Sequence, residues 1–103
     1  MRKLALASLL CLVAVAAWAV AGQAADGKTL YAKCAGCHGA DGAKQALGTG
    51  KPLKGLSAEE AAKAMRGYKA KTFGGEKKAI MEAQCATMSD EDIKALAKYI
   101  AAF

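Results

Sequence analysis

The stretch Cys34-Ala35-Gly36-Cys37-His38 decides the fold of this chain. Two cysteines that are separated by two residues and followed at once by a histidine form the pattern for covalent attachment of haem. Two thiols at this spacing reach the two vinyl groups on one porphyrin edge, and the next residue is placed under the iron. We therefore predict that Cys34 and Cys37 form thioethers and that His38, the only histidine in the sequence, is the proximal iron ligand.

A Cys-x-x-Cys pair is also compatible with a redox dithiol or with half of a zinc site. A redox dithiol usually occurs in a βαβ pattern, which this sequence lacks. Zinc could recruit Cys34, Cys37, Cys85 and His38, but the adjacent Cys37 and His38 would be strained around one tetrahedral ion. Neither site requires a histidine directly after the second cysteine. The favoured cofactor is therefore one haem c, covalently bound through two thioethers.

Residues 1–24 have the features of a secretory signal peptide. Two basic residues precede an apolar run from Leu4 to Val20, and Gly22-Gln23-Ala24 offers small residues where a signal peptidase cuts. Cleavage before Ala25 would leave 79 residues, 25–103, as one small exported domain. The alternative is an uncleaved anchor, because the apolar run is just long enough to span a bilayer.

The domain after the leader is mildly basic and poor in large apolar side chains. It contains 13 Lys and Arg and 9 Asp and Glu, a net charge of +4 before the haem propionates are counted. Every valine and the only tryptophan lie in the leader, and alanine is by far the commonest apolar residue of the domain. A chain this short buries too little surface to be stable with such a core. We expect haem to fill the core and the apo-chain not to fold stably.

Many of the basic side chains lie in or beside the predicted loops. They are Lys51, Lys54, Lys69, Lys71, Lys77 and Lys78. These lysines either solvate the loops or form a positive rim that steers an acidic redox partner to the haem edge. Nucleic acid is excluded as a partner, because no basic stripe is interleaved with exposed aromatic residues.

Capping residues and apolar periodicity predict an all-α domain of three to five short helices. Asp26 is placed to cap a first helix that runs into Cys34 and Cys37. The run Ser57-Ala58-Glu59-Glu60 is a capping box, and the helix that it opens is expected to end at Gly67.

Two more helices are expected after these. A short one follows Gly75 and fades near Ala86, and Ser89 caps the last one. The last helix carries one apolar stripe at spacings of three and four residues, formed by Ile93, Leu96, Ala97 and Ile100. The glycine-rich segment 39–56 shows neither helical nor strand periodicity. Such a long irregular stretch makes sense when it surrounds a cofactor.

An electron carrier needs both axial positions of its iron filled, and methionine is the usual partner of histidine. Met65, Met81 and Met88 are the candidates in the domain, and each could also be a core residue. Met65 lies inside an amphipathic helix, and Met88 is next to the cap of the last helix. Met81 has more chain on both sides and glycines upstream, so we predict Met81 as the second ligand.

The domain resembles a known family along its whole length. The shared residues are Asp26-Gly27, Leu30-Tyr31, Cys34 to His38 with Gly39-Ala40-Asp41-Gly42, Lys51-Pro52, Lys54-Gly55, Gly67-Tyr68, Gly74-Gly75-Glu76, Lys78-Ala79, Met81, Ser89-Asp90-Glu91 and Lys94-Ala95-Leu96-Ala97. With these the chain closely resembles the small periplasmic cytochromes c-553 of sulfate-reducing bacteria, which are class I monohaem cytochromes c.

The resemblance implies a class I cytochrome c fold whose first and last helices cross near Gly27 and Leu96. It implies His38 and Met81 as the axial pair of the iron. It also implies that the carbonyl of Pro52 accepts a hydrogen bond from the other ring nitrogen of His38. Tyr68 is then either a partner of a haem propionate or a tyrosine at the edge of the core.

Three residues depart from the family pattern. Phe73 and Met88 stand where tyrosines are expected, so any hydrogen bonds of those hydroxyls are missing here. Cys85 is the odd cysteine once haem has taken two thiols. We favour a buried apolar role for Cys85 over a thiol that links two molecules.

The resemblance implies a soluble, monomeric, periplasmic one-electron carrier that is not an enzyme. Its expected partners are periplasmic or membrane redox proteins, a dehydrogenase, hydrogenase or oxidase, which dock transiently through charge. The alternative is a ligand-binding haem protein, a gas sensor or a peroxidase-like protein, in which the sixth iron position is open.

Overall fold

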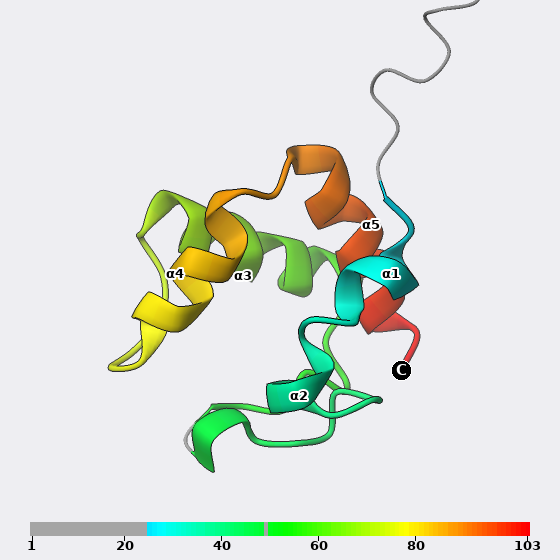
Figure 1. The fold of residues 1–103 in the computed structure, drawn as a ribbon, viewed down its shortest axis with the longest axis horizontal. Helices are drawn as coiled ribbons and strands as arrows, with labels where there is room; N and C mark the ends of the chain where they lie inside the picture. The colour runs from blue at the N-terminus through cyan, green and yellow to red at the C-terminus, as the bar shows by residue number, and fades with distance from the viewer. Residues whose placement is uncertain (1–24, 49) are drawn as a thin grey trace, which may run out of the picture.

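In the computed structural model, which describes residues 25–48 and 50–103, short helices are joined by loops (Figure 1). In chain order they are α1 (Gly27–Tyr31), α2 (Ala35–His38), the 3-10 helix η2 (Ala46–Gly48), α3 (Ala58–Ala70), α4 (Lys78–Ala86) and α5 (Asp90–Ala101). These residues form no strand, which confirms the all-α prediction. None of their helices has both the length and the apolar character to cross a membrane. The predicted leader lies outside the described residues.

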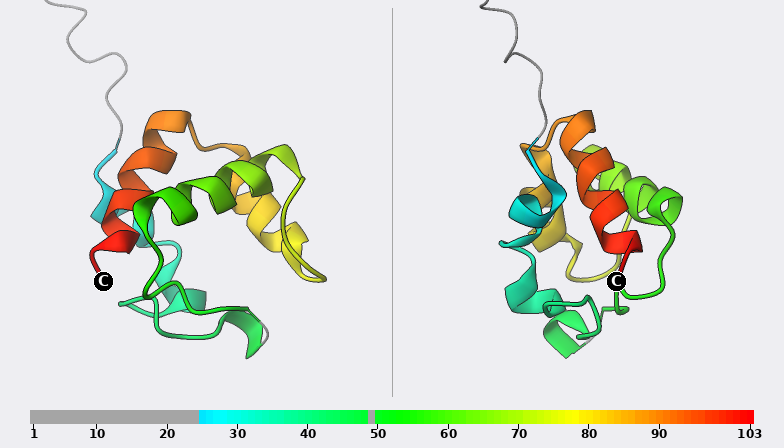
Figure 2. Two further views of the ribbon diagram at one scale, coloured as in Figure 1. Left: turned by 180° about the vertical axis from the view of Figure 1, so that it is seen from behind. Right: turned by 90° about the vertical axis from the view of Figure 1, so that its right-hand side faces the viewer.

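The larger helices pack around α3. Helix α3 contacts both α5 and α4, and α1 packs against α5. Helix α2 contacts η2 and lies with the irregular loop beyond α1 and α5, as both views of Figure 2 show. The motif that should hold the cofactor therefore lies on a small element at one side of the helical core.

The core is formed chiefly by one face of α5 and the residues that cover it. The predicted stripe on α5 is confirmed, because all four of its side chains are buried. Among residues 25–48 and 50–103 the buried apolar residues are Tyr31, Ala61, Ala62, Met65, Cys85, Met88, Ile93, Leu96, Ala97 and Ile100. Three of the ten are alanines, so the protein part of the core has little bulk.

Two predicted helix starts are confirmed by their hydrogen bonds. Ser57 Oγ accepts from the Glu60 amide at 3.0 Å, and Glu60 Oε1 accepts from the Ser57 amide at 3.0 Å, which completes the capping box of α3. Ser89 Oγ accepts from the Asp92 amide at 3.0 Å at the start of α5. Local sequence alone specifies both starts.

The prediction that Gly67 ends the third helix is wrong. The helix continues to Ala70 and is capped by Lys71, whose φ of 63° is left-handed. Gly67 is needed for close packing instead, because a Cβ on it would lie 2.5 Å from the Cβ of Phe73. The glycine at position 67 therefore does not end the helix; it allows Phe73 to pack closely against it.

The first helix is also shorter than predicted. Helix α1 ends at Tyr31, and a turn over residues 32–34 separates it from α2. The amide of Cys34 bonds to the Tyr31 carbonyl at 2.8 Å, which is the tighter i to i−3 pattern of a turn. Asp26 occupies the cap position of α1, but its side chain makes no capping hydrogen bond.

The described residues of the segment 39–56 are irregular, as expected, apart from η2. Its two halves are joined through one carbonyl group. The amides of Leu53 and Lys54 donate to the Gly42 carbonyl at 2.7 and 3.0 Å. Gly42 has a φ of 73° and lies against the ring of Phe103, where a Cβ would be 2.7 Å from the ring. The loop is thereby fixed to the C-terminus.

Candidate haem site

The three residues of the motif lie on a single helical turn. The amides of Cys37 and His38 donate to the Cys34 carbonyl at 3.2 and 2.9 Å. Cys34 is the cap residue of α2, and His38 is its last residue. The structure therefore brings together the two thiols and the imidazole, as the spacing predicted.

The two thiols are free and differ in exposure. Cys37 is exposed, whereas Cys34 is half-buried and its Sγ lies 3.9 Å from the Leu30 carbonyl. Burial raises the pKa of the Cys34 thiol, with smaller opposing influences from its charged neighbours. Both side chains are thus available as thiols for bonding to a cofactor next to α2.

His38 is half-buried and has an unpartnered nitrogen. Burial lowers the pKa of its imidazole, which favours the neutral ring, the form that binds metals. Its Nδ1 is buried and has no hydrogen-bond partner in the described part of the chain. Buried polar atoms normally have partners, and a histidine that ligates a metal through one ring nitrogen normally donates the other N–H to an acceptor, so Nδ1 still needs an acceptor if Nε2 binds the iron.

The hydrogen bond expected from His38 to the Pro52 carbonyl does not form in this structure. The loop next to Pro52 is fixed instead by the bonds from Leu53 and Lys54 to Gly42. Pro52 itself is exposed. The position of this loop is therefore set by hydrogen bonds to the Gly42 carbonyl and not by a hydrogen bond to the imidazole.

The three candidate methionines differ in burial. Met65 is 6 % exposed and Met88 is 4 % exposed, and both are part of the core. Met81 on α4 is half-buried and packs against the edge of the core. Helix α4 packs on α3, whereas α2 packs on η2, so Met81 and His38 belong to two separately packed elements.

Polar contacts hold α4 at its C-terminal end. Lys33 Nζ donates to the Gln84 carbonyl at 3.4 Å, and Lys69 Nζ donates to the Met88 carbonyl. Residues 71–80, which precede Met81, are all exposed. The chain on the C-terminal side of Met81 is therefore held by hydrogen bonds, and the chain on its N-terminal side is exposed to solvent.

Tyr68 and Cys85 lie close to this region. Tyr68 is half-buried and stacks edge-on against Phe73, with ring centroids 5.1 Å apart. Its hydroxyl makes no hydrogen bond in the described residues, so its role toward a propionate stays a prediction. Cys85 is 1 % exposed, which agrees with the favoured apolar role. No group of three or more His, Cys, Asp and Glu side chains converges within residues 25–48 and 50–103.

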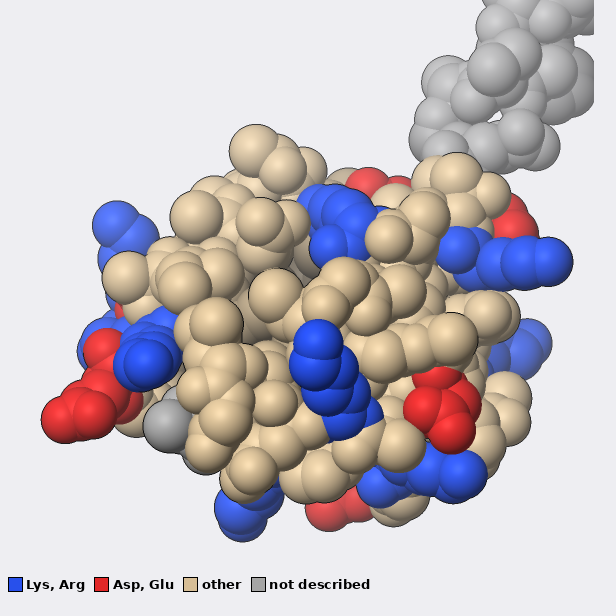
Figure 3. Space-filling model, turned by 60° about the horizontal axis from the view of Figure 1, so that its bottom comes forward, with Lys and Arg blue, Asp and Glu red and all other residues tan. Residues whose placement is uncertain are grey.

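The face that includes α2 and its loop carries scattered charges with uncharged areas between them (Figure 3). All six lysines that the sequence places near loops are exposed. Lys54 pairs with Asp41 at 3.6 Å, and Lys78 lies 3.9 Å from Glu82. The basic groups are thus partly neutralised by nearby acids.

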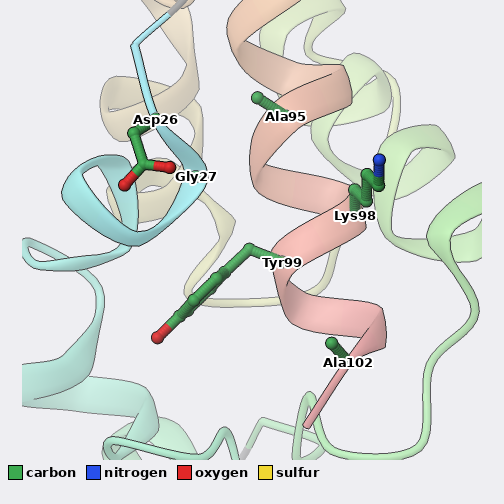
Figure 4. A pocket seen from close by; sticks show the side chains of 6 residues that line it. All are labelled: Asp26, Gly27, Ala95, Lys98, Tyr99 and Ala102. Atoms are coloured by element: carbon green, nitrogen blue, oxygen red, sulfur yellow. The ribbon is translucent and has the colours of Figure 1, made fainter.

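An open groove lies between α1 and α5, away from the motif. Figure 4 shows Asp26 and Gly27 on one side and Ala95, Lys98, Tyr99 and Ala102 on the other. None of the predicted haem residues lines it. The groove marks the crossing of the first and last helices and is not part of the candidate site.

Comparison with known proteins agrees with this geometry. The family model for cytochrome c matches residues 24–103. The chain belongs to the cytochrome c family. It is 45% identical to the cytochrome c-553 of Nitratidesulfovibrio vulgaris over 100 residues, 97% of each chain. It is 49% identical to that of Desulfomicrobium norvegicum over 78 residues, 75% of this chain and 95% of the relative. With the Helicobacter pylori protein of the same name the identity is 46% over 86 residues, 84% and 86% of the two chains.

Membership in the family confirms three predictions. The resemblance to cytochromes c-553, the cytochrome c fold and a covalently bound haem c all follow from it. The crossing of the first and last helices is also as expected, although its closest contact involves Ala95 rather than Leu96.

Sequence reasoning missed one polar contact at the site. The Tyr31 hydroxyl donates to the Gly39 carbonyl at 2.6 Å. A buried tyrosine usually has a hydroxyl partner, so the sequence carried a signal that a partner exists. The identity of that partner depends on the turn after α1, which local patterns did not predict.

Proposed function

We propose that this cytochrome c is a one-electron carrier of the periplasm. Cys34 and Cys37 hold the haem through thioethers, and His38 and Met81 bind the iron from its two sides. The observation that carries the proposal is the single turn that places two free thiols beside the half-buried imidazole of His38.

The choice of Met81 rests on burial. Met65 and Met88 are enclosed in the core, and either would have to leave it to reach a cofactor. Met81 is already at the core edge. Its thioether is a soft ligand that favours ferrous iron and raises the reduction potential. By occupying the sixth position it also keeps small molecules away.

A haem held in this way supplies an iron that gains and loses one electron. The chain needs no general acid, base or nucleophile for that task, and the proposal is a carrier rather than an enzyme. The periplasmic location rests on the leader predicted for residues 1–24. Monomeric behaviour agrees with the burial of Cys85, which leaves no accessible thiol in residues 25–103 as far as the structure describes them, once haem has taken the other two.

The proposed partner is an acidic redox protein, such as a dehydrogenase, a hydrogenase or an oxidase. Lys51, Lys71 and Lys77 are exposed and form no salt bridge within the residues described here. Such free charges raise the rate of encounter more than the affinity, as a transient electron-transfer complex requires.

Carbon monoxide binding tests the sixth ligand against the alternative of a sensor or peroxidase-like protein. The reduced wild-type protein should not bind carbon monoxide, and the Met81→Ala variant should bind it. Binding to the wild-type protein at the same level as to the variant would show an open position and would overturn the carrier proposal.

A further inference from the structure

Tyr31 connects the helical core to the residue that follows His38. Its side chain is 3 % exposed, and its hydroxyl donates to the Gly39 carbonyl at 2.6 Å. Tyr31 ends α1, whereas Gly39 caps α2, so the bond joins two elements across the turn between them.

Helix α2 depends on contacts of this kind. A helix of four residues has no stability of its own in water, and its last carbonyl groups need partners from outside the helix. Lys44 supplies two, because its Nζ donates to the Gly36 carbonyl at 3.3 Å and its amide to the His38 carbonyl at 3.1 Å. The Tyr31 hydroxyl supplies the hydrogen-bond partner for the next carbonyl, that of Gly39. Lys44 is exposed, so Tyr31 is the partner that comes from the core.

The position of the Tyr31 hydroxyl is fixed by its ring. The ring lies 5.6 Å from that of Tyr99 and 5.0 Å from that of Phe103, centroid to centroid. Burial raises the pKa of Tyr31, with Cys34 and Asp41 adding to the effect, so the phenol keeps its proton and remains a donor. A rigid donor of this kind determines where the acceptor carbonyl lies.

The same carbonyl controls the loop beside the imidazole. The Gly42 amide also donates to the Gly39 carbonyl, at 3.3 Å, and the Gly42 carbonyl accepts from Leu53 and Lys54. One hydroxyl thus fixes the end of α2 and, through Gly42, the loop at Pro52. His38 directly precedes Gly39, the first of these two fixed points in the chain.

We infer that Tyr31 is a positioning residue, whose hydroxyl sets the orientation of the His38 ring through the Gly39 peptide. The inference rests on the proposed function, in which His38 ligates the haem iron. It assigns to Tyr31 an effect on the electronic structure of the site in addition to its contribution to the core.

The test compares Tyr31→Phe with Tyr99→Phe in the oxidised holoprotein. Both variants remove one hydroxyl from the same aromatic cluster, but the Tyr99 hydroxyl makes no hydrogen bond in the described residues. We expect Tyr31→Phe to change the hyperfine-shifted haem methyl resonances in the proton NMR spectrum and to shift the reduction potential. Tyr99→Phe should leave both as in the wild type. Wild-type methyl shifts and potential in Tyr31→Phe would overturn the inference, whatever its stability.

A second measurement needs no variant and decides the matter if Tyr31→Phe fails to mature. In the reduced wild-type protein the Tyr31 hydroxyl proton should exchange slowly and give a nuclear Overhauser contact to Gly39. Rapid exchange with solvent would overturn the inference. The spectrum of the wild-type protein reports the ligation itself, so failure of the proposed function is distinguished from failure of this positioning role.

Discussion

Gly27 of α1 lies directly against the main chain of α5 at Ala95. A Cβ on Gly27 would be 2.6 Å from the Ala95 carbonyl oxygen, which is main chain and cannot rotate away. We predict that Gly27→Ala forces the helices apart and lowers the free energy of unfolding by roughly 1–3 kcal/mol. Chemical denaturation measures this. Gly75→Ala is the control, because nothing lies within 4 Å of that position, and equal stability of the two variants would contradict the packing argument.

The pair of Arg66 and Asp90 should make stability depend on pH. Arg66 Nε donates to Asp90 Oδ1 at 2.8 Å, and this bond holds the pKa of Asp90 below its ordinary value. A carboxylate with a lower pKa in the folded state stabilises the protein above its unfolded pKa. That contribution is lost as the pH falls through the folded value.

Denaturation of wild type and Asp90→Asn between neutral and acid pH measures this contribution. The difference in the free energy of unfolding between wild type and Asp90→Asn should be largest near neutral pH and should disappear in acid. Glu76→Gln serves as the control, since Glu76 is exposed and has no salt bridge among the described residues. A difference that stays constant with pH would contradict the assignment.

The free lysines should control the rate of electron transfer with anions. We predict that reduced protein transfers its electron to hexacyanoferrate(III) more slowly as salt rises, because salt screens the attraction. Replacing Lys51, Lys71 and Lys77 together by Gln should slow the reaction by roughly tenfold at low salt. Lys98→Gln, on the groove between α1 and α5, is the control. If the stopped-flow rate neither falls with added salt nor falls in the triple variant, the lysine rim is ruled out.

The chain without haem should not fold stably. Three of the ten buried apolar residues that the described part of the chain contains are alanines, so the protein supplies little apolar surface to offset the entropy of ordering. The Cys34→Ser, Cys37→Ser double variant cannot form thioethers. Its circular dichroism should show little helix and no cooperative thermal transition. A sharp transition would show that the protein core is sufficient.

Local signals in the sequence predicted most of the helices and the turn that carries the haem motif. The capping box at Ser57, the cap at Ser89 and the stripe on α5 depend on residues within one or two turns of each other. The single turn from Cys34 to His38 is local in the same way. These features appear in the structure as predicted.

Features that depend on contacts between distant residues were not predictable. Gly67 is a glycine because Phe73 packs on it, and only the folded chain shows this. The partner of the Tyr31 hydroxyl depends on the turn after α1. The position of Met81 at the core edge follows from the packing of α4 on α3, which spacing along the chain does not reveal.

The absorption spectrum of the oxidised holoprotein tests the central claim, that Met81 is the second iron ligand. Sulfur bound to ferric iron gives a weak band in the red, and the wild-type protein should show it together with the bands of haem c. The band should be absent in Met81→Ala and present in Met65→Leu, which conserves the volume of a buried methionine. Haem c bands without the red band in the wild type, or a red band that survives in Met81→Ala, would contradict the account.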